Sequence, residues 1–199
     1  MSGNYAAIIQ DNIKALYKNE TRNAEAAIGA QRNGDEILFK AFGGQCVITP
    51  EGISLDGRPL TDPSGVVVSL YALHATELPM KEQPFKAFKE MDDSMPYAGA
   101  FATHTENILV PRVEAIKAKL DVIPEKLDGT AGPDDMPGDF SMVVQPLPKI
   151  RLCYIFYLPD DDFPASVTCL FSNNAGSHMP TDGLADVGEY TSRTILNLL

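Results

Sequence analysis

The sequence predicts an α+β fold, in which a largely antiparallel sheet packs against helices in a single domain spanning residues 1–199. Two groups of short apolar runs, separated by turn residues, predict strands that pair with their neighbours along the chain. Segments with apolar residues at helical spacing lie before, between and after these groups, an order typical of α+β proteins. The 199 residues amount to about 1.3 domains of ~150 residues, and a hydrophobic content of 44% with 22% charged residues is typical of a globular protein.

Two helices are expected at the N-terminal end, within residues 1–33. In the first, from 5 to 18, apolar side chains recur at helical spacing, and Asn4 is the expected N-cap. The second helix is short and rich in alanine, with Thr21 as its expected N-cap. Because alanine favours helix and is small, this segment is expected to pack closely against a neighbour.

After Gly34 the pattern changes to short β-rich runs separated by glycine-bearing turns. The runs at 37–39, 47–48 and 53–55 predict an antiparallel meander. A strongly apolar helix is expected to follow, from 66 to 78.

The middle of the chain has a less regular pattern. Residues 85–89 predict a strand with imperfect alternation, and residues 96–120 predict a helical stretch that Pro111 divides into two pieces. The acidic segment 128–139 is rich in glycine and proline and is expected to form a surface loop. A mobile lid over a site is the alternative, because loops of this length are uncommon unless they are functional or disordered.

The last third carries the clearest pattern, with strands expected at 142–144, 150–158 and 167–171. Both parities of 150–158 are apolar, so this strand is expected to be central and covered on both faces. A closing helix is expected after Thr181, its predicted N-cap, with Asp182 near the positive end of the helix dipole.

The charge of the chain limits the classes of partner. Sixteen basic and 27 acidic residues give a net charge of −11, so phosphate backbones and anionic membrane surfaces are expected to be repelled. No apolar run approaches the ~18 residues of a membrane span, and the first residues do not resemble a signal peptide. The odd number of cysteines, three, favours reduced thiols and a cytoplasmic location.

Motifs that carry a known chemistry are missing from the sequence: there is no GxGxxG, Walker loop, HExxH, GxSxG or CxxC. The candidate binding residues are therefore single side chains that belong to no recognised motif. They are His74, Glu90, Tyr97, Asp161, His178 and Asp182. No metal site and no cofactor are expected, because nothing in the histidine spacing requires the three rings to converge.

The histidines differ in their expected surroundings. His74 lies in the apolar helix and is interpreted as a buried, hydrogen-bonded ring, with a ligand-facing role as the alternative. His104, between two threonines, is expected to be exposed without a function. His178 lies at a strand-to-helix junction, where it either fixes the loop by hydrogen bonding or faces a ligand at the sheet end. Cys153 and Cys169 fall in expected central strands, where thiols behave as small hydrophobic groups.

The C-terminal block resembles a known prokaryotic family, called domain of unknown function 3786. The resemblance is carried by the order of its parts: a proline-bearing turn at 146–148, the strand 150–158, an acid-rich turn ending in Phe-Pro at 160–164, a strand ending in Leu-Phe at 170–171, and a small-residue loop with His178. The segment around His74 and the residues from 85 to 101 are similar more loosely.

The resemblance implies the kind of organism in which the protein acts, but it implies no particular reaction. The family is typical of anaerobic bacteria and archaea, and some members carry an additional cysteine-rich iron–sulfur domain. The three scattered cysteines of this sequence cannot supply the four thiolates of such a cluster. The resemblance carries no catalytic residue over to this chain.

Three functional hypotheses follow. The leading one is a non-catalytic accessory domain of anaerobic metabolism that binds a small molecule or a redox or corrinoid protein partner. The second is a hydrolase or transferase with His178 as acid or base, Asp161, Glu90 or Asp182 as orienting carboxylate, and Tyr97 or His74 in the same pocket. The third is a self-associating structural protein, a homodimer that uses a strand edge or the C-terminal helix. A concave pocket shared by His74 and His178 would favour the second.

Overall fold

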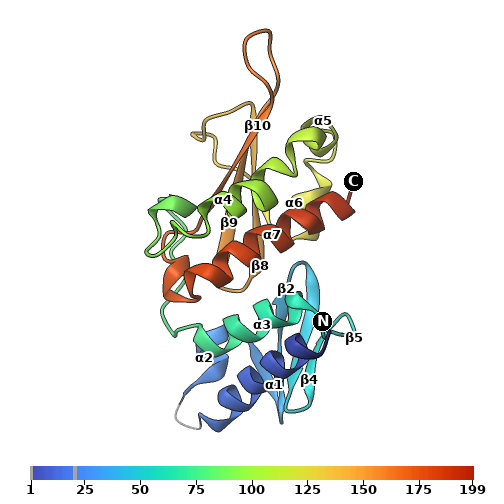
Figure 1. Ribbon diagram of the computed structural model, residues 1–199, viewed down its shortest axis with the longest axis vertical. Coiled ribbons are helices and arrows are strands. Elements are labelled where there is room, and N and C mark those ends of the chain that lie inside the picture. The colour runs from blue at the N-terminus through green and yellow to red at the C-terminus, as the bar shows by residue number, and fades with distance from the viewer. Residues whose placement is uncertain (1, 20–21) are drawn as a thin grey trace.

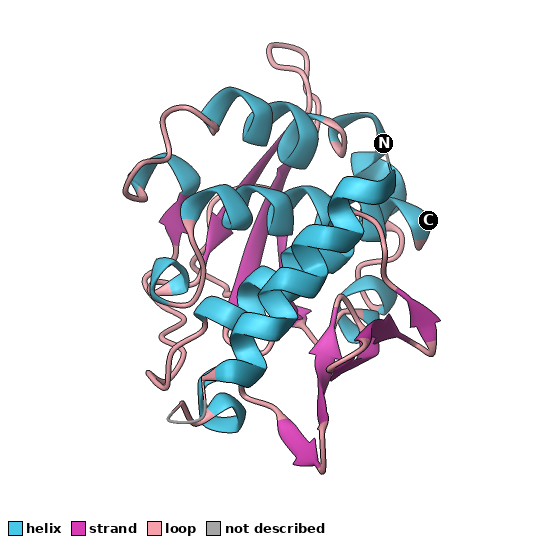
Figure 2. Cartoon of the chain, turned by 60° about the horizontal axis from the view of Figure 1, so that its bottom comes forward, coloured by secondary structure: helices cyan, strands magenta, loops and turns pink. Residues whose placement is uncertain are grey.

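The computed structural model describes residues 2–19 and 22–199 and has the predicted α+β architecture, consistent with a single domain. Helices lie in front of two sheets in Figure 1, and the turned view of Figure 2 shows the same separation of helices and strands. The α-helices are α1 (Ser2–Lys18), α2 (Ala24–Ile28), α3 (Pro63–His74), α4 (Ala98–Phe101), α5 (Val113–Lys117), α6 (Val122–Lys126) and α7 (Thr181–Asn197).

The strands form two antiparallel sheets, where the sequence pattern suggested one. The first is a meander of neighbouring strands in the order β1-β2-β3-β4-β5, and the second has the order β6-β10-β9-β8-β7. The strands are β1 (Gln31–Asn33), β2 (Glu36–Ala41), β3 (Gly44–Thr49), β4 (Gly52–Leu55), β5 (Arg58–Pro59), β6 (Lys86–Ala87), β7 (Thr130–Ala131), β8 (Phe140–Leu147), β9 (Ile150–Tyr157) and β10 (Ser166–Phe171). Helices α1 and α3 accompany the first sheet, and α4 and α7 accompany the second (Figure 1).

The two sheets share one hydrophobic core, and a turn joins them. The β2–β3 loop consists of Phe42 and Gly43, both with positive φ, as a two-residue type I′ hairpin requires. This turn places the Phe42 ring beside Tyr190 of α7, with 6.2 Å between ring centroids, and its amide donates to the Pro146 carbonyl at 2.7 Å. A Cβ at Gly43 would lie 2.2 Å from the Lys126 carbonyl oxygen, so only glycine permits this approach.

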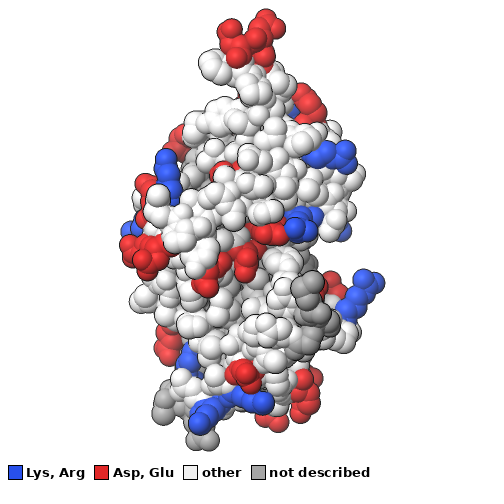
Figure 3. All heavy atoms as spheres, in the orientation of Figure 1, with Lys and Arg blue, Asp and Glu red and all other residues white. Residues whose placement is uncertain are grey.

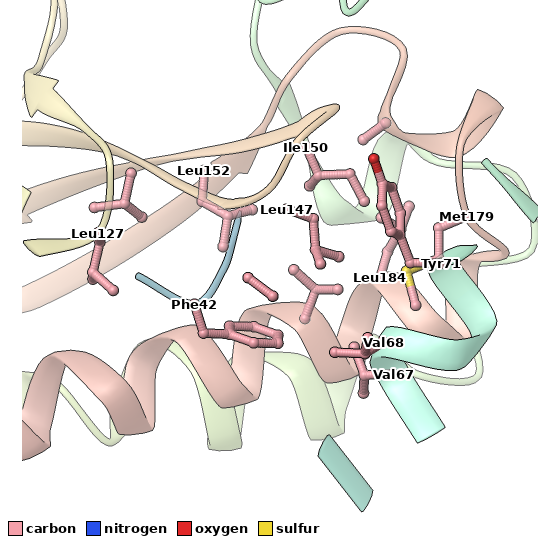
Figure 4. Close-up of a cluster of buried hydrophobic side chains, with 14 of the residues drawn as sticks. Phe42, Val67, Val68, Tyr71, Leu127, Leu147, Ile150, Leu152, Met179 and Leu184 are labelled. Atoms are coloured by element: carbon pink, nitrogen blue, oxygen red, sulfur yellow. The ribbon is translucent and has the colours of Figure 1, made fainter. Parts of the chain in front are cut away.

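Figure 4 shows how side chains from both parts meet in this core. Val67, Val68 and Tyr71 of α3 lie near Leu184 of α7, while Phe42 points toward side chains of the second sheet. All of them belong to one continuous cluster of buried residues. The buried cluster therefore extends across both sheets and their helices.

Both predicted N-terminal helices are confirmed, but the N-cap residues observed differ from those predicted. Helix α1 begins at Ser2, so Asn4 lies inside the helix instead of capping it. Thr21 lies outside the described residues, and the observed N-cap of α2 is Asn23, whose side chain accepts a hydrogen bond from the Ala26 amide. The last residues of the segment 1–33 form β1, a strand that the sequence pattern did not predict.

In the middle of the chain the predicted meander is confirmed and extended by short edge strands. Helix α3 begins at Pro63, earlier than expected, because Asp62 caps it and proline suits the first helical turn. Residues 85–89 give only the two-residue strand β6 before a 3-10 helix begins. Pro111 does break the following stretch: it lies at the start of a 3-10 helix after α4 and a π-helical segment, Ala102–Asn107.

The C-terminal strands are confirmed, with β9 buried along most of its length between β8 and β10. Thr181 is the first residue of α7, not its cap; Pro180 occupies the cap position, and the Thr181 hydroxyl donates to the Asp92 carbonyl at 2.7 Å. The acidic segment 128–139 lies against the second sheet through β7, and its Asp139 amide donates to the Phe156 carbonyl at 2.9 Å.

Candidate functional site

The six candidate residues do not form one site. Asp161 lies in the exposed loop between β9 and β10, which projects at the top of Figure 1. His74 is the last residue of α3 and is exposed, so the expectation of a buried ring was wrong. Glu90 is also exposed, and its carboxylate accepts a hydrogen bond from the Ala87 amide at 2.7 Å.

His178 is buried, with 0% of its surface exposed, and is held by a hydrogen-bond network. Asn174 holds one side of the ring: its amide oxygen accepts from the Lys81 amide at 2.7 Å, and its nitrogen donates to the Pro79 carbonyl at 3.0 Å and lies 3.3 Å from His178 Nε2. On the other side, the Thr76 amide donates to Nδ1 at 3.4 Å, and the Thr76 hydroxyl lies 3.2 Å from the same atom.

Burial, followed by the nearby charge of Lys149, lowers the pKa of His178 to about 4. A doubly protonated ring would also set its two N–H groups against the N–H groups of Asn174 and Thr76. Lys149 itself is buried and donates to the carbonyls of Ala26, Thr76 and Leu78 at 2.7, 2.6 and 3.1 Å. This arrangement fits a histidine that holds the segment after α3 in place, and it leaves no ring nitrogen open to a substrate.

Tyr97 and Asp182 are brought together, as the hypothesis of a shared site requires. They line one groove, of about 180 Å³, between α7 and the segment that contains α4 and the π-helix. His104 lines the same groove and is exposed, as expected. His74, Glu90, Asp161 and His178 do not line this groove.

A larger pocket, of about 330 Å³, lies on the other side of the same segment. Its apolar walls include Phe88 and Phe101, whose rings stack with 4.3 Å between centroids and 10° between planes. Ala98 and Ala102 line it from the helical segment, and their small side chains leave the space open. The polar lining includes Glu106 together with Thr168, Cys169 and the exposed Lys89.

Glu106 is positioned by the π-helical segment and by β10. One carboxylate oxygen, Oε1, accepts a hydrogen bond from the Cys169 amide at 2.9 Å. Burial raises the pKa of Glu106, and the hydrogen bond from the Cys169 amide opposes this shift. π-Helical turns are rare and frequently occur at functional sites. A partly desolvated carboxylate in a pocket is a recognised sign of such a site.

The three thiols of the chain, one of which lines this pocket, are buried and uncharged. Cys169 is buried, and burial raises the pKa of its thiol far above the ordinary value, with the charge of Glu106 as a second cause. Burial also raises the pKa of Cys46 and of Cys153 to about 12. All three therefore stay protonated near neutral pH and are poor nucleophiles.

Metal-binding groups and membrane-spanning helices are both missing from the described residues, 2–19 and 22–199. No group of three or more His, Cys, Asp or Glu side chains is placed there to hold a metal ion. No helix in that part of the chain is long and apolar enough to cross a membrane.

Sequence reasoning missed Glu106. The stretch from Ala102 to Asn107 contains no motif and no unusual composition, and its π-helical hydrogen bonding has no recognised sequence signal. The only related indication was Pro111, which predicted that the helix would be interrupted nearby.

A family model described as Domain of unknown function (DUF3786) matches residues 20–194. The chain belongs to the DUF3786 family. The matched residues include both sheets, the pocket beside Glu106 and the groove beside Asp182. The match confirms the resemblance seen in the C-terminal block. No curated protein and no solved structure shows significant similarity to this DUF3786 chain.

Proposed function

We propose that this DUF3786 chain is a small-ligand-binding domain, and that its ligand occupies the pocket beside Glu106. The ligand that fits best is a compact molecule with an apolar body and a primary ammonium group directed at the Glu106 carboxylate. The observation that carries the proposal is a partly desolvated carboxylate in a pocket that also has a wall of stacked aromatic rings.

The shape and lining of the pocket support this class of ligand. Small-molecule sites are concave and mostly apolar, with a few polar groups that fix the orientation of the ligand. A volume of about 330 Å³ lies at the small end of the ~300–1,000 Å³ typical of ligand pockets, which suits a ligand with one small ring. The stacked rings of Phe88 and Phe101 offer an apolar wall, and the carboxylate of Glu106 offers a charge-assisted hydrogen bond.

Binding is better supported than catalysis. The titratable groups of the pocket are Glu106, the exposed Lys89 and a thiol that stays protonated, so the lining offers no activated nucleophile. The hydrolase or transferase hypothesis depended on His178, whose ring has no exposed surface. The setting of this role, in redox- or corrinoid-linked anaerobic metabolism, is the part of this proposal that comes from the family resemblance alone. The cytoplasmic location is proposed from the odd number of cysteines.

The test compares benzylamine with benzyl alcohol, which has a similar shape but no ammonium group. Benzylamine should raise the melting temperature of the wild-type chain, because a ligand at 100 times its dissociation constant stabilises the folded state by about 2.7 kcal/mol. Benzyl alcohol should do so much less. Glu106→Gln should weaken benzylamine binding about tenfold, equivalent to ~1.4 kcal/mol, while keeping the hydrogen bond from Cys169.

Two further variants separate the pocket from general charge effects. Glu114→Gln removes an exposed carboxylate elsewhere and should leave benzylamine binding unchanged. Ala102→Phe fills the pocket and should abolish binding of both probes. Equal binding of benzylamine by the wild type and by Glu106→Gln, or undiminished binding by Ala102→Phe, would contradict the proposal.

A further inference from the structure

The groove on the other side of the helical segment carries an inference that does not depend on the Glu106 pocket. Asp182, Asp186 and Glu189 line it from α7. Their spacing of four and three residues places the three carboxylates on one face of the helix. Figure 3 shows acidic side chains gathered across the middle of the visible face, where α7 lies in Figure 1.

The three carboxylates are not equally satisfied. Glu189 forms an ion pair with Arg193 at 2.7 Å, and Asp182 accepts a hydrogen bond from the Gly183 amide at 2.9 Å. Asp186 is exposed at the groove, and its carboxylate has no hydrogen bond or ion pair with another described residue. Desolvation raises the pKa of Asp186, and the charges of Glu189 and Asp182 raise it further. The groove therefore contains a carboxylate that lacks a counter-charge.

Thr105 gives a second and independent indication of a missing group. The residue lines the groove and is 0% exposed, and its hydroxyl has no hydrogen-bond partner among the described residues. A buried hydroxyl left without a partner loses the hydrogen bonds that it would make with water, so such groups are rare in native structures. The Thr105 hydroxyl faces Gly188 of α7, where a Cβ would lie 2.9 Å from it, so a polar group that enters between α7 and the helical segment would supply the missing hydrogen bond.

The surroundings of the groove indicate a protein as the source of that group. Met95, two residues before Tyr97 in the chain, is 78% exposed, and Tyr97 is 39% exposed at the groove itself. Exposed methionine and tyrosine side chains are enriched in protein interfaces. Tyrosine also stacks on guanidinium groups, and arginine binds carboxylates through paired hydrogen bonds.

We propose that this groove is a docking site for a partner protein, which inserts an arginine side chain between Tyr97 and the carboxylates of α7. The guanidinium pairs with Asp186 and stacks on Tyr97. Its remaining N–H groups supply a donor for the Thr105 hydroxyl. Apolar residues on either side of the partner's arginine pack on Met95.

The test uses an acetylated Leu-Arg-Leu amide peptide, with the citrulline analogue as its neutral control, and ¹⁵N–¹H NMR spectra of the full chain. The arginine peptide should shift amide signals of residues 95–105 and 182–189 in a saturable way. The citrulline peptide should bind at least tenfold more weakly, because it lacks the positive charge. Agmatine, a free guanidinium compound, should bind more weakly than the arginine peptide because it lacks the flanking apolar groups.

Variants test whether the arginine peptide binds in this groove. Asp186→Asn should weaken binding of the arginine peptide about tenfold. Asp161→Asn, an exposed aspartate in the projecting loop, should leave it unchanged. Glu106→Gln should also leave it unchanged, so a failure of the ligand pocket and a failure of this docking site can be told apart.

Several outcomes would overturn the proposal. Equal binding of agmatine and peptide would assign the groove to a free small molecule. The same shifts on titration with Mg²⁺ alone would assign it to a metal ion. A dimer that Asp186→Asn dissociates in light scattering would assign it to a second copy of the chain. Equal shifts with the citrulline peptide, or none in the two segments, would remove the role of a guanidinium.

Discussion

Acidification should destabilise the chain through His178. The pKa of this histidine is about 4 in the folded chain, because burial and the charge of Lys149 oppose protonation, whereas its ordinary value is 6.5. Below pH 6.5 the unfolded chain binds a proton that the folded chain does not take up until about pH 4. The free energy of unfolding therefore falls as the pH is lowered through this window.

The size of this effect follows from the two pKa values. The difference of 6.5 − 4 is 2.5 units, and one unit is worth 1.36 kcal/mol, so the full loss is about 3 kcal/mol. This is a large part of the 5–15 kcal/mol that typically stabilise a domain. Glu106 and Asp186, whose pKa values are raised, act in the opposite direction, because the folded state binds their protons more readily.

The assay isolates His178 from these carboxylates by comparison with a variant. Urea unfolding of the wild type and of His178→Gln is measured between pH ~7.5 and ~4.5 by linear extrapolation. The variant should be less stable at the upper pH, and its stability should fall by about 3 kcal/mol less across the range. His74→Gln, which removes an exposed ring, should keep the wild-type slope.

A direct measurement keeps the reasoning testable if His178→Gln does not fold. In the wild-type chain, the His178 ring resonances should stay constant between pH ~7.5 and ~5.5. A His178 ring that titrates within this interval, or a variant with the wild-type slope, would refute the buried neutral histidine.

Two packing and capping predictions can be checked by thermal or urea unfolding. Gly188→Ala should destabilise by about 1–3 kcal/mol, because the new Cβ would lie 2.6 Å from Phe101 Cε2, whereas Gly176→Ala, with no atom within 4 Å, should be close to neutral. Asp62→Ala should destabilise by ~1 kcal/mol through loss of the N-cap of α3, and Asp62→Asn should restore most of it. A neutral Gly188→Ala, or a loss that Asn does not restore at 62, would contradict these contacts.

The parts of the fold that could be predicted depend on local patterns. Strand β9 is apolar on both parities, which required a central position, and the meander β2 to β4 follows from short runs and glycine turns. The division of the strands into two sheets could not be predicted, because it depends on which distant segments meet. Phe42 shows the difficulty: its ring joins the two sheets, yet in the sequence it is a single aromatic residue before two glycines.

The candidate site was predicted only in part, for a related reason. Asp182 was selected for its place near the start of a helix, and Tyr97 lies in a segment that loosely resembles the family. The structure brings these two residues into one groove. Glu106 and Thr105 gave no signal, because their importance comes from burial and from partners that are distant in sequence or missing. His178 was recognised as a candidate, but the depth of its burial depends on how the segment after α3 packs over it.

The helical segment from 97 to 107 connects the two proposed sites physically. Ala98, Ala102 and Glu106, spaced by four residues, face the ligand pocket, while Phe101 lines both the pocket and the groove. Phe101 therefore forms part of the wall between them, and a ligand that moves its ring changes the shape of the groove. Any coupling between the sites must then be reciprocal, since each occupant alters the binding free energy of the other by the same amount. Gly188→Ala, whose new Cβ would crowd both the Phe101 ring and the Thr105 hydroxyl, should weaken both probes, whereas Glu106→Gln and Asp186→Asn should each weaken one.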